Sequence, residues 1–478
     1  MMKYLFSFLL TCIVFFTATA QQISYDFATL SAIKYADKIK QFEKFKAPKV
    51  FTDKASQVWY DEFVTDRNST LSFAFRHNDI IYDSILLDKC NSILKRIALA
   101  NPTYRFDTIK LYINRSLSAN AACYGEGTVF INLGLFLWID NDDELALVLG
   151  HEFAHQLLNH SESAMKKSIA TLTSDAFKKE LKDIKKADYG KYEKFKNLMK
   201  GIKVESGKHS RYKESEADSL GLIFCKNAKY NILNAAKILL KFDNVDDIFK
   251  SNKLYALKDF FEKTNIDLSF FTVKPKYNGL SSANVTMNVD KDIDSIKTHP
   301  DCKKRYESIV GNNSFPTIAC CSSLLNTYNV YKEKALLEIV RSLYEYNSLG
   351  YCTHLSFFAL KNNFSPQFYK NILSACFSKI YYNDINLKRY NSVNSDADRE
   401  SNLKELQDFL FAVSNKDLDI LAVHFLTKTE NVNAVDFEFA NTMYQTQVKQ
   451  KDTAVAYITL NKKFPNNKYS YLIQKKQK

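Results

Sequence analysis

The chain has 478 residues, of which 46% are hydrophobic and 25% are charged, and its formal net charge is +13. This length allows two or three domains with a sizeable core, and the composition excludes a disordered chain. Only 11 glycines and 7 prolines are present, which argues against a loop-rich all-β protein and favours helices. The lysines are spread along the sequence without a recognition motif of interleaved aromatic residues, so the charge indicates a solvated basic surface rather than a nucleic-acid-binding protein.

Residues 1–20 are predicted to form a secretory signal peptide. Lys3 supplies a basic start, Tyr4 to Phe16 form an apolar stretch too short to span a bilayer comfortably, and small residues at 18–20 offer a cleavage site. An uncleaved anchor is the alternative. No later stretch is apolar over a membrane-spanning length, so we expect the mature chain to be exported and to have no membrane span.

Eight cysteines remain after the signal peptide is removed. An even number in an oxidising compartment permits disulfides, but their spacing assigns no pairs. No C-x-x-C pair is present, so a structural zinc ribbon is unsupported. These cysteines are Cys90, Cys123, Cys225, Cys302, Cys320, Cys321, Cys352 and Cys376.

The first part of the chain shows both helical and strand patterns. Apolar residues at three- and four-residue steps predict helices at 29–46 and 84–98. Alternating residues predict a strand at 106–114, and a second strand at 127–134 follows a glycine turn at 125–127.

Longer helices are predicted next. The segment 140–160 is a strong helix, because acidic residues fill its first turn and complement the helix dipole. A lysine-rich helical stretch follows at about 163–203, and another helix covers 211–227.

The turn-rich segment 311–317 indicates a domain boundary. Beyond it, 320–478 is predicted to be all-α, with loops near 362–366 and 391–398. Helical hairpins of tetratricopeptide type fit this pattern, although no clean repeat period is present. The predicted fold class is therefore α+β and mostly helical, with a small sheet and an active-site helix in 21–312 and an all-α domain after it.

The string His-Glu-Phe-Ala-His at 151–155 holds two of the eight histidines. His151 and His155 are four residues apart, so they share one helix face and both can reach one ion at about 2.0–2.1 Å. A catalytic zinc site typically has three protein ligands and an open position for water. Glu214, in the helix at 211–227, can be the third ligand, and Asp218 can accept a hydrogen bond from the outer nitrogen of a ligand histidine.

Glu152 is the expected general base. Zinc lowers the pKa of a bound water to about 7, so a nearby carboxylate can take its proton and pass it to the leaving amine of a peptide. The alternative is that these are ordinary structural histidines on a helix.

The segments DELALVLGHEFAHQLLNH and SRYKESEADSLG resemble the HtpX-like and CAAX-prenyl-protease-like family of zinc metallopeptidases, of the gluzincin type. Two further segments match in order, at 120–136 and at 298–305, so the resemblance covers roughly 80–310. It implies a zincin-like catalytic domain with one Zn²⁺ per chain. The implied site residues are the ligands His151, His155 and Glu214, the base Glu152, and Asp218 as the hydrogen-bond partner of a ligand histidine.

The resemblance also bears on other charged residues. It implies that a loop brings His299 to the metal, where it either blocks the water position or stabilises the oxyanion; a capping or packing role is the alternative. His160 fits the family's helix but is expected to point off the ligand face and to be structural. Arg211 and Arg305 are expected to pair with buried acids.

The strand at 127–134 has a predicted binding role. As an exposed edge, Gly127, Thr128, Val129, Phe130 and Ile131 would hold an extended substrate as an added strand, with broad selectivity for unfolded chains. An internal strand is the alternative. Cys123, Tyr124 and Glu126 stand where the family often has proline before the glycine turn, which leaves the shape of the turn open.

The sequence thus predicts an exported zinc endopeptidase that degrades unfolded or misassembled envelope proteins. The membrane helices of HtpX and the prenyl proteases are absent, so a soluble periplasmic or membrane-associated protein of a Gram-negative bacterium is expected. The C-terminal helices would be available to an envelope protein partner. The alternative function is an envelope chaperone or assembly factor whose peptidase site is latent and held by His299.

Overall fold

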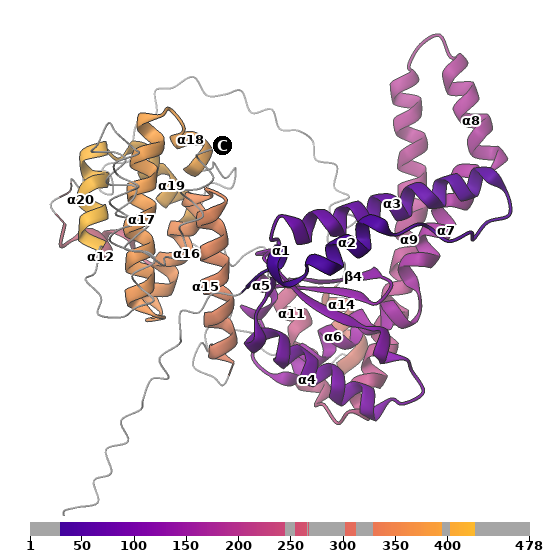
Figure 1. Cartoon of the computed structure of the whole chain (residues 1–478), viewed down its shortest axis with the longest axis horizontal. Coiled ribbons are helices and arrows are strands. Elements are labelled where there is room, and N and C mark those ends of the chain that lie inside the picture. The colour runs from indigo at the N-terminus through magenta and orange to yellow at the C-terminus, as the bar shows by residue number, and fades with distance from the viewer. Residues whose placement is uncertain are drawn as a thin grey trace, which may run out of the picture.

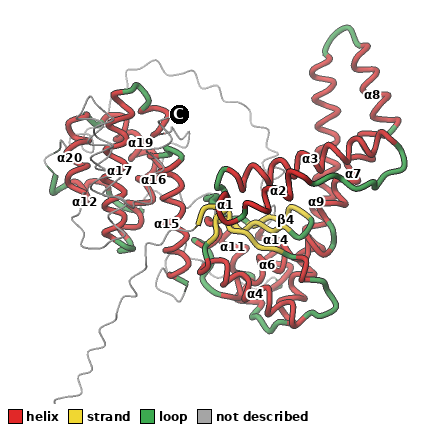
Figure 2. Tube along the Cα trace, viewed as in Figure 1, coloured by secondary structure: helices red, strands yellow, loops and turns green. Residues whose placement is uncertain are grey.

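The computed structural model describes residues 29–243, 254–264, 266, 302–311, 328–393 and 402–425 (Figure 1). The predicted signal peptide, His299 and the last part of the predicted helical domain lie outside the described residues. The fold is α+β and mostly helical, as predicted. The described helices of residues 31–243 lie around a small sheet, and those of residues 349–425 form a group beside this part (Figure 2).

The sheet has five strands in the order β1-β2-β3-β5-β4. β3 and β5 are parallel, and the other neighbouring pairs are antiparallel. The strands are β1 (Thr29–Leu30), β2 (Ile80–Tyr82), β3 (Lys110–Asn114), β4 (Ala121–Gly125) and β5 (Thr128–Asn132).

The prediction that residues 127–131 form an exposed edge is wrong. β5 pairs with β3 on one side and with β4 on the other, and Val129 and Ile131 are fully buried. A strand with partners on both sides has no free backbone groups for an added strand. Among the described strands, the free edge on this side of the sheet is β4, which a turn of three positive-φ residues at 125–127 joins to β5.

Helices cover both faces of the sheet. On one face α2 (Ala36–Lys44) and α3 (Lys54–Arg76) pack through Phe42 and Phe75 onto Tyr112 and Phe130. On the other face, α4 (Ser84–Ala100) and α6 (Asp142–Leu157) contribute buried residues to one core. The strand residues that point into this core alternate along β3 and β5 and are Leu111, Ile113, Val129 and Ile131. α6 therefore lies against the sheet, and the short α5 (Leu133–Phe136) connects β5 toward it.

The lysine-rich stretch forms a projecting helical hairpin. α7 (His160–Thr173) and α8 (Asp175–Lys186) lead into α9 (Lys191–Asn227), which returns to the body of the protein (Figure 1). The sequence predicted a break in helix between 203 and 211, but α9 is continuous over 37 residues.

The remaining described elements are helical. α15 (Asn329–Glu345) joins the C-terminal helices to the sheet-containing part through buried ion pairs, which link Lys334 to Asp83 at 3.1 Å and Arg115 to Glu345 at 2.6 Å. Among the described helices, none is long and apolar enough to cross a membrane. The helices are α1 (Ser31–Lys34), α10 (Ile232–Ala235), α11 (Lys237–Asp243), α12 (Leu257–Phe261), α14 (Cys302–Val310), α15 (Asn329–Glu345), α16 (Leu349–Lys361), α17 (Pro366–Ile385), α18 (Arg389–Val393), α19 (Asn402–Ala412) and α20 (Asn415–Phe425).

Candidate metal centre

The helix that carries His151 and His155 is fixed at its start. The side chain of Asn141 caps α6 by accepting a hydrogen bond from the backbone N–H of Glu144 at 3.0 Å. Glu144 is itself buried and accepts hydrogen bonds from Lys241 at 2.7 and 2.8 Å. The buried apolar residues that follow hold α6 in the core, so the two histidines of its C-terminal half have a defined position.

Two glycines set the approach of α6 to α9. A Cβ added at Gly221 would lie 2.9 Å from the backbone nitrogen of His151, and one added at Gly150 would lie 3.2 Å from the carbonyl oxygen of Gly221. The helix backbones are therefore in direct contact at this crossing. The contact brings Glu214, about two turns earlier on α9, to the histidine pair.

Gly221→Ala should weaken metal binding and lower stability. Alanine favours a helix over glycine by about 1 kcal/mol, but overpacking against a rigid backbone costs about 1–3 kcal/mol, so we expect a net loss of up to about 2 kcal/mol. The measurements are the free energy of unfolding in urea and the zinc content after dialysis. Ser219→Ala, at an exposed position of the same helix, is the matched control. A more stable Gly221→Ala protein with full zinc content would contradict this account of the crossing.

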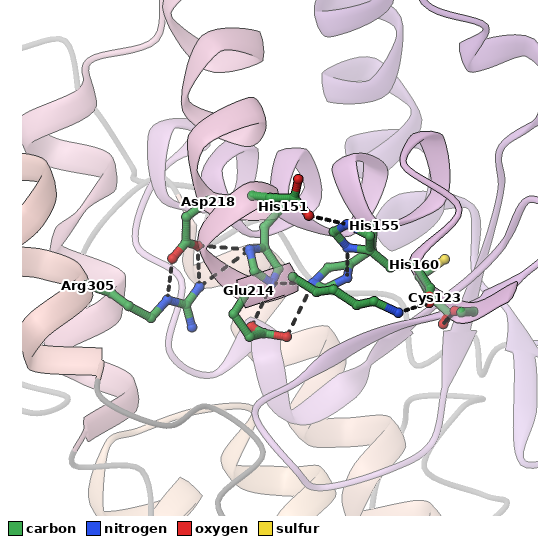
Figure 3. Close-up of polar contacts among 10 residues, drawn as sticks. Cys123, His151, His155, His160, Glu214, Asp218 and Arg305 are labelled. Carbon is green, nitrogen blue, oxygen red and sulfur yellow. Dashed lines mark hydrogen bonds and ion pairs between the residues drawn. The ribbon is translucent and has the colours of Figure 1, made fainter. Parts of the chain in front are cut away.

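Three potential ligand atoms converge at the crossing (Figure 3). The Nε2 atoms of His151 and His155 are 3.0 Å apart, and each lies 3.4 Å from a carboxylate oxygen of Glu214. Ligands at about 2.0–2.1 Å from one tetrahedral ion stand about 3.3 Å from each other, so these separations fit a zinc ion. Two imidazoles and one carboxylate are also a donor set that zinc accepts.

On the side away from the other ligands, His151 contacts Asp218, which in turn pairs with Arg305 (Figure 3). Its Nδ1 lies 2.9 Å from Asp218, and Arg305 of α14 donates to Asp218 at 2.6 and 2.7 Å. With Nδ1 donating to Asp218, a neutral His151 ring has its lone pair on Nε2, the atom that faces Glu214 and His155 and would bind a metal. Arg305 pairs with an acid as predicted, although Asp218 is only partly buried, whereas Arg211 is exposed.

These contacts shift the pKa values of the group. Burial alone would lower the pKa of His151, but its hydrogen bonds with Asp218 and Glu214 raise it to about 9. Burial would raise the pKa of Glu214, yet the hydrogen bonds from the two histidines bring it far below its usual range. Without a metal, Asp218 and Glu214 thus favour the protonated, positively charged form of His151. A metal cation that binds there would displace this proton and supply the positive charge instead.

His160 is not one of the converging ligands, as expected, but it contacts His155, a contact that was not predicted. Its Nδ1 lies 2.9 Å from Nδ1 of His155, and its Nε2 lies 3.4 Å from Glu216 (Figure 3). The prediction assumed one helix over 140–160, but α6 ends at Leu157 and Asn159 is left-handed, with φ of 53°. α7 therefore starts in a new direction and places His160 against the outer nitrogen of His155.

Glu152 lies between the histidines in sequence and is 6% exposed. Burial raises the pKa of its carboxyl group, and the nearby His151 and His155 offset part of that rise. A backbone hydrogen bond from Cys123 of β4 also favours the charged form. The free edge of the sheet is thus next to the carboxylate.

β4 is fixed to the helices around the site. Ser161 donates to the carbonyl oxygen of Cys123 at 3.2 Å, and the Cys123 thiol lies 3.2 Å from the side-chain oxygen of Gln156. Burial raises the pKa of this thiol to about 11, so it stays protonated at neutral pH. These contacts with Ser161 and Gln156, together with its pairing to β5, hold β4 beside Glu152.

Comparison with known proteins matches this part of the chain. Residues 87–312 match the model of peptidase family M48. The Beta-barrel assembly-enhancing protease of Yersinia pestis is 32% identical over 96 residues, a match that spans 20% of this chain and 20% of that protein.

Proposed function

We propose, from the match of residues 87–312 to peptidase family M48, that this chain is a zinc-dependent endopeptidase that uses Glu152 as its general base. The family is one of zinc metallopeptidases. The observation that carries the proposal is the convergence of His151, His155 and Glu214 from two helices at ligand spacing, with the buried Glu152 on the same helix as the histidines.

Each residue of the site has a proposed task. A zinc ion held by His151, His155 and Glu214 would supply a Lewis acid that polarises an attacking water and the peptide carbonyl. Glu152 takes the proton from the water and delivers it to the leaving amine. Its raised pKa suits both steps, because the carboxyl group must accept a proton and hold it until the amine departs.

The surrounding polar residues keep the ligands in position. Asp218, held by Arg305, fixes the ring of His151, and His160 with Glu216 does the same for His155. Partners of this kind set the tautomer and orientation of ligand imidazoles. Both rings then present Nε2 to the metal position without having to reorder.

The edge of β4 is the proposed substrate-binding strand, in place of β5. An extended peptide that adds to this edge would pass beside Glu152 and would make main-chain hydrogen bonds, which at Cys123 replace the present bonds to Glu152 and Ser161. Such binding tolerates many side chains. We therefore propose unfolded or misassembled proteins of the bacterial envelope as substrates, in agreement with the predicted signal peptide and with the name of the Yersinia relative.

Casein cleavage with and without a zinc chelator tests the proposal. We expect cleavage by the wild-type protein, its loss on chelation and its return when zinc is added. His299→Ala, compared with the exposed His77→Ala as a control, tests a self-inhibited site. Cleavage that appears only in His299→Ala would indicate a latent peptidase, and no cleavage by any of these proteins would count against the enzyme.

A further inference from the structure

The tip of the helical hairpin, residues 185–196, is a separate feature of the molecule. It comprises the end of α8, the connection to α9 and the first residues of α9, and it lies at the far end of the projection in Figure 1. The packing of the hairpin uses other residues: Phe177, Leu181 and Ile184 recur along α8 and are half-buried where α8 packs against α7 and α9.

Three aromatic side chains of the tip are exposed to solvent. Tyr189 is 89% exposed, Tyr192 is 74% exposed and Phe195 is 43% exposed. Single exposed apolar residues are common, but a group of them at the end of a projection marks a binding surface. Tyrosine has an apolar ring and a polar hydroxyl, which suits it to a boundary between water and an apolar phase.

The same twelve residues are strongly basic. Five lysines and two acids give the tip a net charge of +3, and all seven side chains are exposed. The lysines are Lys185, Lys186, Lys191, Lys194 and Lys196, and the acids are Asp188 and Glu193.

We propose that the hairpin tip binds the surface of an anionic phospholipid bilayer. The aromatic rings would enter the interface between headgroups and acyl chains, while the lysines would contact the phosphates. An acidic protein would also attract the lysines, but a stable protein interface needs about 800 Å² from each partner, which the end of one helical hairpin does not offer. A bilayer has no such requirement, because it accommodates a narrow projection anywhere on its surface. This proposal is independent of peptidase activity.

Vesicle co-sedimentation tests the proposal with the chain from residue 21 onward. We expect binding to vesicles of phosphatidylcholine with one part in four phosphatidylglycerol, weakening as salt is raised, and no binding to phosphatidylcholine alone. Absence of binding to the anionic vesicles, or equal binding to both kinds, would overturn the proposal.

Two sets of variants locate the contact. Lys186→Gln, Lys191→Gln and Lys194→Gln together should lower vesicle affinity by about a hundredfold, since each lysine near an anionic surface contributes about a factor of five. Lys95→Gln, Lys226→Gln and Lys229→Gln remove the same charge from exposed positions elsewhere and should change affinity little. An equal loss in both triple variants would show attraction by net charge only and would overturn the assignment to the tip.

Tyr189→Ser with Tyr192→Ser tests the aromatic contribution at constant charge. We expect at least a tenfold loss of affinity for the anionic vesicles, because two exposed rings would no longer enter the interface. Unchanged affinity would contradict insertion of the tip. All substituted side chains are exposed, and circular dichroism of each variant checks that the fold is retained.

Discussion

Glu152→Gln should lower kcat/KM for peptide hydrolysis by about 10²–10⁴-fold, the usual contribution of a general base, while zinc stays bound. Glutamine has nearly the same shape as glutamate but cannot accept the proton of the attacking water. Glu152 is not one of the three residues whose ligand atoms converge, so the zinc content of Glu152→Gln should be that of the wild type. Removing a buried charge also relieves the desolvation that raises the pKa of Glu152, so the fold should not lose stability.

The measurement is cleavage of a fluorogenic peptide beside the zinc content of the same preparation. Glu162→Gln is the matched control, because Glu162 is on the neighbouring α7 and its side chain is 47% exposed. Normal hydrolysis by zinc-loaded Glu152→Gln would exclude this residue as the base. Loss of hydrolysis together with loss of zinc would instead assign Glu152 to metal binding.

Glu214→Ala should lower zinc affinity by more than about 100-fold. Loss of a residue that only hydrogen-bonds a metal ligand typically costs about 10–100-fold, and Glu214 is proposed as a ligand itself. The substitution removes the carboxylate that lies 3.4 Å from the Nε2 atoms of both His151 and His155. The two histidines alone make an incomplete site, because catalytic zinc typically has three protein ligands. Hydrolysis should be lost as well and should return only partly at high zinc concentration.

Zinc affinity is measured by competition with a coloured chelator. Asp218→Asn should show the smaller loss, of about 10–100-fold, because it changes only the partner of His151. Ser215→Ala, at an exposed position beside Glu214, should bind zinc as the wild type does. If Glu214→Ala kept one tightly bound zinc, the proposed ligand set would be wrong.

The features of the site that follow from helix periodicity were predictable from sequence. His151 and His155, or Glu214 and Asp218, share a face because each pair is four residues apart on one helix. The meeting of the two helices was a hypothesis that rested on the need for a third metal ligand and on the family resemblance. Its physical basis, the contact between Gly150 and Gly221, involves residues 71 positions apart that no local pattern connects.

Other features depend on contacts between distant segments or on exceptions to regular patterns. β5 was predicted to be an edge strand. Its internal position results from parallel pairing with β3 and antiparallel pairing with β4, and neither pairing can be read from a local pattern. α3 was not predicted, because the polar residues Ser56, Asn68 and Ser72 interrupt the apolar residues of its buried face. The contact of His160 with His155 was not predicted, because a single left-handed residue, Asn159, ends the helical period.

The continuity of α9 links the hairpin tip to the catalytic site. Lys191 at the tip and Glu214 at the site are 23 residues apart on one helix, which at 1.5 Å per residue is about 35 Å. With the tip on a bilayer and the helix upright, a segment emerging from that bilayer would need about ten extended residues to cover this height. On both proposals, α9 would act as a gauge of reach that admits only polypeptides extending at least this far from the bilayer.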